Sequence, residues 1–372
     1  MQKLAQSWLV YELSGSPFWL GLDAFLGEIP IFLFSLIGGV VADRKSRRAI
    51  LLGSQIVQMS CAFTLAALVA FGLVHVWHIL CLSFLVGLAQ AFGGPAYQAL
   101  IPTLVEREDL QNAIALNSIQ FNLARVIGPV LGGLAREKLG VAWCFSLNGL
   151  SFVAVILSLL LVKSRFKPPP VQESMLESFK QGIGFVRGQV AMISLIVLAF
   201  LMTLLGIPLI VFLPVIARDV LRQGVNTFTL LLSLSGAGAV TGALIVAGMG
   251  HQANKGRRSL EMLIILGTLM TGFALSRSLV LSSILIFLSG AALIGAFAMI
   301  TSLVQIITSD NMRGRVMSVY NVALRGGMPF GSLLSGALVP QFTAPGMLAV
   351  NGVLLVLLGV YFLAVHRKIA NL

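Results

Sequence analysis

Two acidic residues stand inside an apolar stretch that is long enough to cross a bilayer. Asp23 and Glu28 lie within residues 18–42, and Pro30 follows shortly after Glu28. A charge at the bilayer centre costs at least ~2.5–3.5 kcal/mol on insertion scales, so intramembrane carboxylates mark functional sites. Burial favours the protonated form of a carboxyl group, which suits a group that takes up and releases a proton. Glu28 and Asp23 are therefore our candidates for proton coupling.

The spacing of these two acids separates them on a helix. A separation of five residues turns an α-helix by ~500°, which leaves the two side chains ~140° apart. They cannot face one line of a cavity, and Glu28 lies deeper in the span, so we favour Glu28 as the coupling group. The alternative is that Glu28 pairs with a neighbour such as Arg125 for structural reasons alone.

The composition explains why these acids must be positioned by membrane helices. The chain has 372 residues, of which 58% are hydrophobic and 10% charged, and its mean hydropathy is +0.97. Soluble domains carry ~25% charged residues. The sequence lacks the short alternating segments of membrane β-barrels, so α-helices are the expected spanning elements. The net charge of +12 is spread in small clusters between apolar runs, which indicates topology signals and argues against a nucleic-acid partner.

The hydropathy pattern predicts an all-α membrane protein of about 11 full spans and a truncated first helix. Residues 1–13 are too short to span, and we interpret them as the outer half of a helix that ends at the turn residues 14–17. With residues 1–13 counted as helix 1, the expected spans 2 to 12 are 18–42, 49–73, a span from 76 to beyond 95, 112–135, 141–162, 190–217, 228–249, 260–275, 279–307, 316–339 and 347–365.

Two halves flank the longest polar segment. Residues 1–162 form the expected N-terminal bundle and residues 190–372 the C-terminal bundle, each of six helices. Residues 163–189 are the expected linker, which contains three prolines at 168–170 and an amphipathic piece at 173–186. Lys and Arg concentrate in the connections after the even-numbered spans, in the linker and at the C-terminus. The positive-inside rule places these segments in the cytoplasm.

An internal repeat supports the division into halves. Ser118, Arg125 and Pro129 recur at the same spacing 200 residues later as Ser318, Arg325 and Pro329. This pattern indicates parallel duplication of a six-helix unit, as in transporters built from two like halves.

A basic turn joins the second and third expected helices. Its key residues are Gly39, Asp43, Arg44, Arg47 and Arg48. This spacing resembles the signature between spans 2 and 3 of the major facilitator superfamily, with Ser46 where the family usually has Gly. The resemblance implies two six-helix bundles with alternating access.

The same resemblance gives Asp43 a role. It implies that Asp43 latches the cytoplasmic gate against the start of span 11, near Arg313 and Arg315; alternatively, the basic cluster only fixes topology. The matching turn in the second half has Gly256, Arg257 and Arg258, but Ala253 stands where the acid would be.

Span 5 carries a glycine and proline motif. Gly128, Pro129, Gly132 and Gly133 allow close helix approach and a kink. They resemble the antiporter motif of drug-exporting facilitators, with Ala115 and Ala124 in place of its two upstream glycines. The alternative is a tight packing interface without a transport role.

Together with residues 8–17, 112–133 and 313–318, this motif resembles the branch that contains the enterobactin exporters and related efflux proteins. The resemblance implies a bacterial inner-membrane protein that exports a siderophore or drug.

Polar residues of spans 5 and 11 are the candidates for lining a substrate cavity. Arg125 and Arg325 could bind an anionic substrate, or instead form ion pairs or cap carbonyls that stabilise the bundle. The other cavity candidates are polar side chains at Asn117, Gln120, Asn122, Tyr320 and Asn321.

The sequence contains no nucleotide-binding or hydrolytic motif and no metal-ligand spacing, so we predict no enzyme activity, no cofactor and no metal. The expected partners are a small-molecule substrate, protons and the lipid bilayer, and no oligomeric state is predicted. We predict export of a small amphipathic compound by proton antiport. The alternatives are an importer or uniporter, or a transport-inactive sensor or lipid-handling subunit.

Overall fold

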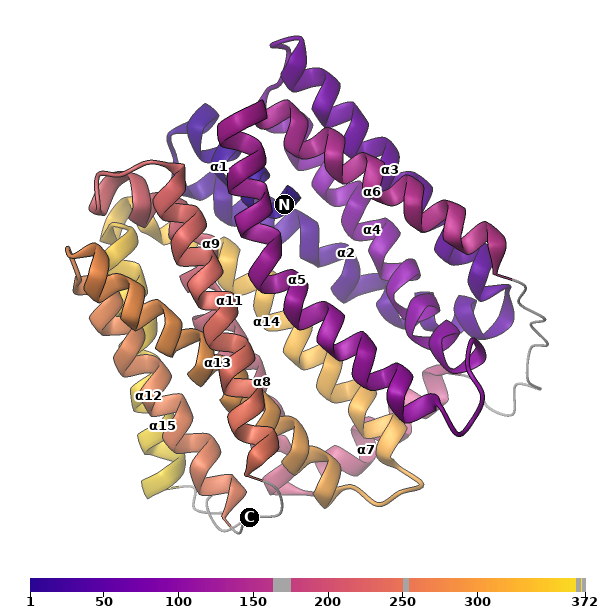
Figure 1. Ribbon diagram of the computed structural model, residues 1–372. Helices are drawn as coiled ribbons and strands as arrows, with labels where there is room; N and C mark the ends of the chain where they lie inside the picture. The colour runs from indigo at the N-terminus through magenta and orange to yellow at the C-terminus, as the bar shows by residue number, and fades with distance from the viewer. Residues whose placement is uncertain (163–174, 250–253, 366–368, 370–372) are drawn as a thin grey trace. The chain divides into compact units, whose positions relative to one another are not determined.

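The computed structural model describes residues 1–162, 175–249, 254–365 and 369, and these residues form helices and short connections (Figure 1). The three prolines at 168–170, Ala253, and the basic residues Arg367 and Lys368 lie outside the described residues. Eleven helical segments are long and apolar enough to cross a membrane, which confirms the predicted number of full spans.

The chain divides into two compact units, Met1–Gln172 and Glu173–Leu372. All four tryptophans of the chain lie in the first unit. The helices of the first unit are α1 (Gln2–Ser14), α2 (Pro17–Arg44), α3 (Arg47–Ala70), α4 (Val76–Leu100), α5 (Leu110–Leu139) and α6 (Val141–Leu161).

The helices of the second unit begin with α7, which the sequence pattern assigned to the linker as an amphipathic piece. They are α7 (Met175–Arg187), α8 (Val190–Gly206), α9 (Pro208–Val211), α10 (Leu213–Val215), α11 (Val225–Gly248), α12 (Lys255–Leu275), α13 (Leu279–Ile307), α14 (Arg313–Phe342) and α15 (Ala344–Ala364). The segment Val190–Val220 counts as a single candidate span although it is broken into α8, α9, α10 and a π-helical turn.

The turn between α1 and α2 follows from its residues. Gly15 takes a positive φ of 61° after the last residue of α1, a conformation that glycine adopts without steric cost. Its N–H donates to the carbonyl of Tyr11 at 2.9 Å. Pro17 then occupies the first turn of α2, where its missing N–H is not needed. The two helices are therefore joined tightly at the end of the unit that lies away from the basic turn.

The same helix pairs form in both units. In the first unit α2 packs along α4, and α3 packs on α4 and α6; in the second unit α11 packs along α13, and α12 packs on α13 and α15. These helices hold equivalent places in the two halves of the chain. The repeated pairing agrees with a duplicated six-helix unit, which stays a prediction.

Glycines bring the backbones of the paired helices into direct contact. A Cβ atom at Gly38 would overlap the carbonyl oxygen of Ala91 in α4, and one at Gly87 would overlap that of Gly27 in α2. In the second unit, Cβ atoms at Gly238 and Gly242 would overlap carbonyl oxygens of α13. Small residues that permit such close approach are the usual basis of helix packing in membranes.

This packing predicts a position-specific effect of alanine in α11. Gly238→Ala should destabilise the protein by ~1–3 kcal/mol because the new methyl group meets the backbone of Phe287. The measurement is the temperature at which the detergent-solubilised protein loses its monodisperse elution peak.

The matched control is Gly248→Ala in the same helix, where no heavy atom lies within 4 Å of the new Cβ. It should leave this temperature unchanged or raise it, because alanine is the better helix former by ~0.5–1 kcal/mol. Equal losses in the two variants would contradict the proposed contact between α11 and α13.

Candidate functional site

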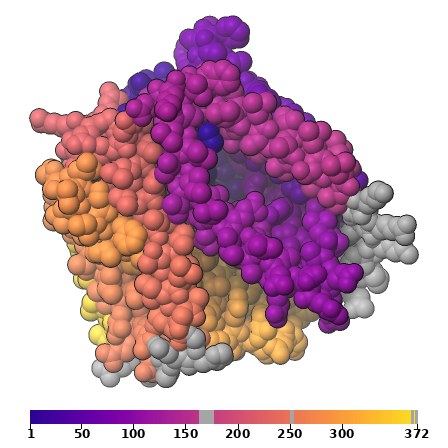
Figure 2. Space-filling view, in the orientation of Figure 1, coloured from indigo at the N-terminus to yellow at the C-terminus, as the bar shows by residue number. Residues whose placement is uncertain are grey.

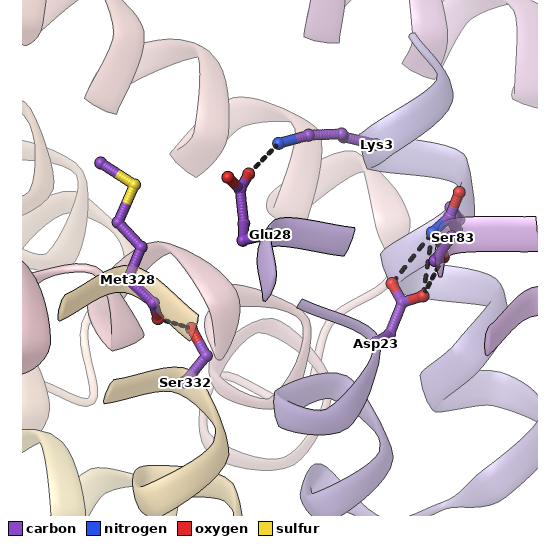
Figure 3. Close-up of polar contacts among 7 residues, drawn as sticks. Lys3, Asp23, Glu28, Ser83, Met328 and Ser332 are labelled. Atoms are coloured by element: carbon purple, nitrogen blue, oxygen red, sulfur yellow. Dashed lines mark hydrogen bonds and ion pairs between the residues drawn. The ribbon is translucent and has the colours of Figure 1, made fainter. Parts of the chain in front are cut away.

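Asp23 is buried inside the first unit, where neutral side chains from two other helices hold its carboxylate (Figure 3). The amide nitrogen of Gln6 in α1 donates to both carboxylate oxygens, at 3.0 Å each. The hydroxyl of Ser83 in α4 donates to Oδ1 at 2.5 Å, and Gln6 also donates to Ser83 at 2.8 Å. We call Gln6, Asp23 and Ser83 the Asp23 cluster. The cluster links α1, α2 and α4 by hydrogen bonds between side chains.

Glu28 has a different partner. Its Oε1 lies 3.4 Å from Nζ of Lys3 in α1, and its side chain is 25% exposed. Figure 3 shows the two carboxylates directed toward separate partners, as their predicted separation around the helix requires. The predicted alternative partner, Arg125, does not form this ion pair; Lys3 does.

The basic turn is shorter than the sequence pattern indicates. α2 ends at Arg44 and α3 begins at Arg47, so only Lys45 and Ser46 lie between the two helices. Ser46 is the N-cap of α3, and its hydroxyl accepts the N–H of Ala49 at 3.4 Å. Its φ of −58° needs no glycine. Serine therefore replaces the family's glycine without strain and adds a helix cap.

Arg47 and Arg48 connect the start of α3 to the ends of two other helices. The Nη1 atom of Arg47 donates to the carbonyl of Ala99, in the last turn of α4, at 2.8 Å. The Nη2 atom of Arg48 donates to the carbonyl of Leu160, in the last turn of α6, at 2.8 Å. The last carbonyls of a helix have no partner within it, and the helix dipole favours positive charge there. The two arginines thus tie three helices of the first unit together.

Asp43 lies in the last turn of α2 and is largely exposed. Its Oδ1 is 3.9 Å from Nη2 of Arg47, and its side chain is 56% exposed. A long, exposed pair contributes little free energy, which leaves Asp43 available for another partner. The latch of Asp43 on the start of span 11 stays a prediction.

At the start of α14, Arg313 pairs with Asp310 at 2.6 Å. The carbonyl oxygen of Arg315 lies 2.6 Å from the Cβ position of Gly182 in α7. α7 is thus packed against the start of α14, which places α7 within the second unit.

The matching turn of the second unit lacks these cross-helix contacts at Arg257. This arginine bonds Glu261 of its own helix, with 2.9 Å between Nε and Oε1. Both side chains are about half exposed or more. Gly39 and Arg44 complete the predicted basic motif of the first unit and belong to the last turns of α2.

Most of α5 is exposed from its start to the glycine motif. Figure 2 shows the first unit hollowed beside α5, with indigo residues of the N-terminal region visible inside. Asn117 accepts the hydroxyl of Tyr97 in α4 at 2.6 Å, and Asn122 donates to the carbonyl of Ser118 in its own helix. The side chains of Gln120 and Arg125 are exposed. They form no hydrogen bond or ion pair with another residue in the described part of the chain.

The matched residues of α14 divide into two groups. Tyr320 is fully buried, and its hydroxyl lies 2.8 Å from that of Thr301 in α13. Asn321 and Arg325 are exposed and form no hydrogen bond or ion pair with the residues that the structure describes. Arg125 and Arg325 thus have in common an exposed guanidinium group without a structural partner among those residues.

The glycine motif of α5 packs against the first turn of α1. A Cβ at Gly132 would lie 3.1 Å from Cα of Met1, and one at Gly128 would lie 3.6 Å from the nitrogen of the same residue. Gly133 is also buried, whereas Pro129 is partly exposed. This placement is what a tight packing interface requires; a transport role of the motif stays a prediction.

The motif keeps its proline but not its glycines in the second unit. Met328 and Ser332 stand 200 residues after Gly128 and Gly132, and the Ser332 hydroxyl donates to the Met328 carbonyl at 2.9 Å (Figure 3). Close contacts with α8 come instead from Gly327 and Gly331, one position earlier.

The sequence pattern did not identify Lys3, Gln6 or Ser83. Lys3 and Gln6 are polar positions of the short amphipathic α1, and Ser83 is a single hydroxyl within an apolar run of α4. A polar residue isolated in an apolar span is the signal that could have selected Ser83, because such a group needs a partner in the bilayer. The pattern alone does not say which helix supplies that partner.

Comparisons with known proteins agree with this architecture. A family model described as "Transmembrane secretion effector" matches residues 1–370. The enterobactin exporter EntS of Shigella boydii serotype 18 is 27% identical over 365 residues, which cover 96% of this chain and 85% of that protein. EntS of Escherichia coli O139:H28 is 26% identical over the same coverage.

Solved transporters share the fold. The nucleoside transporter NupG has a TM-score of 0.73 and 15% identity, with 97% of this chain and 93% of that chain covered. The human organic anion transporter MFSD10 has a TM-score of 0.62 and 18% identity, with 91% and 82% covered. At these identities the likeness shows the fold alone.

The contacts of Arg47 predict that it stabilises the first unit. Arg47→Ala should destabilise the protein by ~1.5–3 kcal/mol, because it removes a charged hydrogen bond to the end of α4. The control is Arg257→Ala, whose exposed ion pair within one helix contributes ~0–1 kcal/mol. Thermal loss of the monodisperse elution peak measures both. A larger effect of Arg257→Ala would overturn the assignment.

Proposed function

The chain belongs to the transmembrane secretion effector family of major facilitator transporters, and we propose that it exports a small amphipathic compound by proton antiport. The compound is a siderophore or a drug. The observation that carries the proposal is the similarity to EntS exporters over 96% of the chain. The bacterial origin of these relatives supports a place in the bacterial inner membrane, and the distribution of Lys and Arg supports a cytoplasmic C-terminus.

The intramembrane carboxylates support the proton part of the proposal. Asp23 and Glu28 both lie within a candidate membrane span and on one unit. An antiporter needs a group that is protonated when it faces one side of the membrane and ionised when it faces the other. Carboxyl groups held inside a transporter bundle meet this requirement.

Export by proton antiport predicts a defined signal in inside-out vesicles. Respiration acidifies their lumen, which a fluorescent weak base reports by quenching. Addition of enterobactin or ethidium should partly reverse the quenching, because each exported molecule lets protons leave the lumen. The double variant Asp23→Asn, Glu28→Gln should abolish this response.

The matched control is Glu261→Gln, which alters an exposed carboxylate in α12 and should preserve the response. An unchanged gradient with every compound would favour a sensor or lipid-handling protein. Accumulation of the compound by intact cells would favour an importer.

Exposed guanidinium groups support an anionic substrate. Arg125 and Arg325 have no ion-pair partner among the described residues. No ion pair therefore supports the alternative that these arginines stabilise the bundle. An arginine binds a carboxylate or catecholate anion through paired N–H donors. This chemistry suits a siderophore better than a lipophilic cation.

The anion proposal predicts a substrate-dependent loss. Arg125→Ala and Arg325→Ala should each lower enterobactin export roughly tenfold or more, as expected for a lost charged hydrogen bond of ~1.5–3 kcal/mol. Export of ethidium should change little. Transport rates of the two compounds in cells that lack their own exporters give the ratio of the two losses. Arg257→Ala is the control. Equal losses for both compounds would argue against anion binding.

A further inference from the structure

The Asp23 cluster has the composition of a proton-binding site. Asp23 is only 8% exposed, and both of its hydrogen-bonding partners are neutral. Within the described part of the chain it forms no ion pair. A buried carboxylate usually has a cation beside it or a functional reason to lack one.

The two partners fit both protonation states of the carboxyl group. A serine hydroxyl can donate to an ionised carboxylate, or rotate and accept a hydrogen bond from the protonated acid. The Gln6 amide donates to a carboxyl oxygen in either state. Proton uptake by Asp23 therefore requires one hydroxyl rotation, after which the Ser83 oxygen accepts a hydrogen bond from the protonated acid.

Glu28 lacks neutral partners that fit both protonation states. Its partner is the ammonium group of Lys3, so a proton on Glu28 would remove one half of an ion pair. The Glu28 side chain is also more exposed than Asp23. Of the two predicted coupling carboxylates, Asp23 has the environment that tolerates a neutral form.

The charged groups near the cluster come mainly from α1. Lys3 acts electrostatically on Asp23 while it bonds Glu28, which makes it the common neighbour of the two acids. Glu12 of α1 is paired with Arg136 at 3.1 Å. The titratable side chains of α4 near this end are His78, which accepts the N–H of His75, and the free thiol of Cys81.

The cluster lies toward the membrane face opposite the basic turn. At ~1.5 Å rise per residue, Asp23 is ~9 Å along α2 from Pro17, and Ser83 is ~10 Å along α4 from Val76. Both distances are about a third of a ~30 Å hydrocarbon core. The cluster therefore lies nearer this face than the basic turn does.

We propose that Asp23 is the proton-binding carboxyl of this transporter and that Gln6 and Ser83 are its positioning residues. The assignment to coupling rests on the proposed antiport. One proton passes from water at the near face to an Asp23 oxygen, and the same proton leaves to the cytoplasm after the transporter changes its access. No other group is consumed or formed.

Infrared difference spectroscopy tests this assignment without any substrate. Purified full-length protein in liposomes is stepped between acidic and alkaline buffer, and the carboxylic-acid carbonyl band is recorded. Asp23→Asn should remove the band of a buried acid, whereas Glu28→Gln should keep it. A band that persists in Asp23→Asn, or that disappears in Glu28→Gln, overturns the proposal.

Variants of Ser83 test the positioning role. Ser83→Ala should shift the frequency of the band because the titrating carboxyl loses a hydrogen bond, and Ser83→Thr should restore it because the hydroxyl is kept. A band that is identical in all three proteins would exclude Ser83 as a positioning residue. This comparison also decides the case if Asp23→Asn does not yield folded protein.

The vesicle assay separates the two proposals. If vesicles show substrate-driven proton release but the infrared spectra show no band from Asp23, antiport would stand and the assignment of Asp23 would be overturned. A titrating Asp23 without substrate-driven proton release would confirm the binding site and overturn antiport.

Discussion

A polar group inside a bilayer must find its hydrogen-bonding partner within the protein, and this constraint shapes both units. Many hydroxyl groups in the spans meet it locally. Ser146 and Thr241, for example, each donate to the carbonyl four residues earlier in the same helix. Ser54 and Ser83 instead reach another helix, at the carbonyl of Ala89 and at Asp23. Hydroxyls of this second kind add hydrogen bonds between the packed helices.

The two units share their helix pairing but differ at the basic turn. In the first unit, arginines at the start of α3 bind the ends of α4 and α6. In the second unit, Arg257 binds an acid of its own helix. A positive charge at the start of a helix is unfavourable for that helix. In the first unit, the hydrogen bonds of these arginines to neighbouring helices offset this cost. The two units thus share the same helix pairing, while Arg47 and Arg257 make different polar contacts.

Hydropathy and turn chemistry predict the fold because both depend on residues that are close together in the sequence. The number of spans, the turn at Gly15 and the basic turn follow from local patterns. The candidate site was predicted in part: the helical angle between Asp23 and Glu28 indicated separate environments, as the structure shows. Gln6 and Ser83 could not be predicted as partners, because the facing of a nearly all-apolar helix leaves little trace in its sequence.

The uneven placement of tryptophan has an optical consequence. Because all four tryptophans lie in the first unit, intrinsic tryptophan emission comes from this unit alone. Trp8 has the guanidinium carbon of Arg136 at 5.4 Å from its ring centroid. Trp8 therefore adds a contribution from the junction of α1 with α5 to this emission.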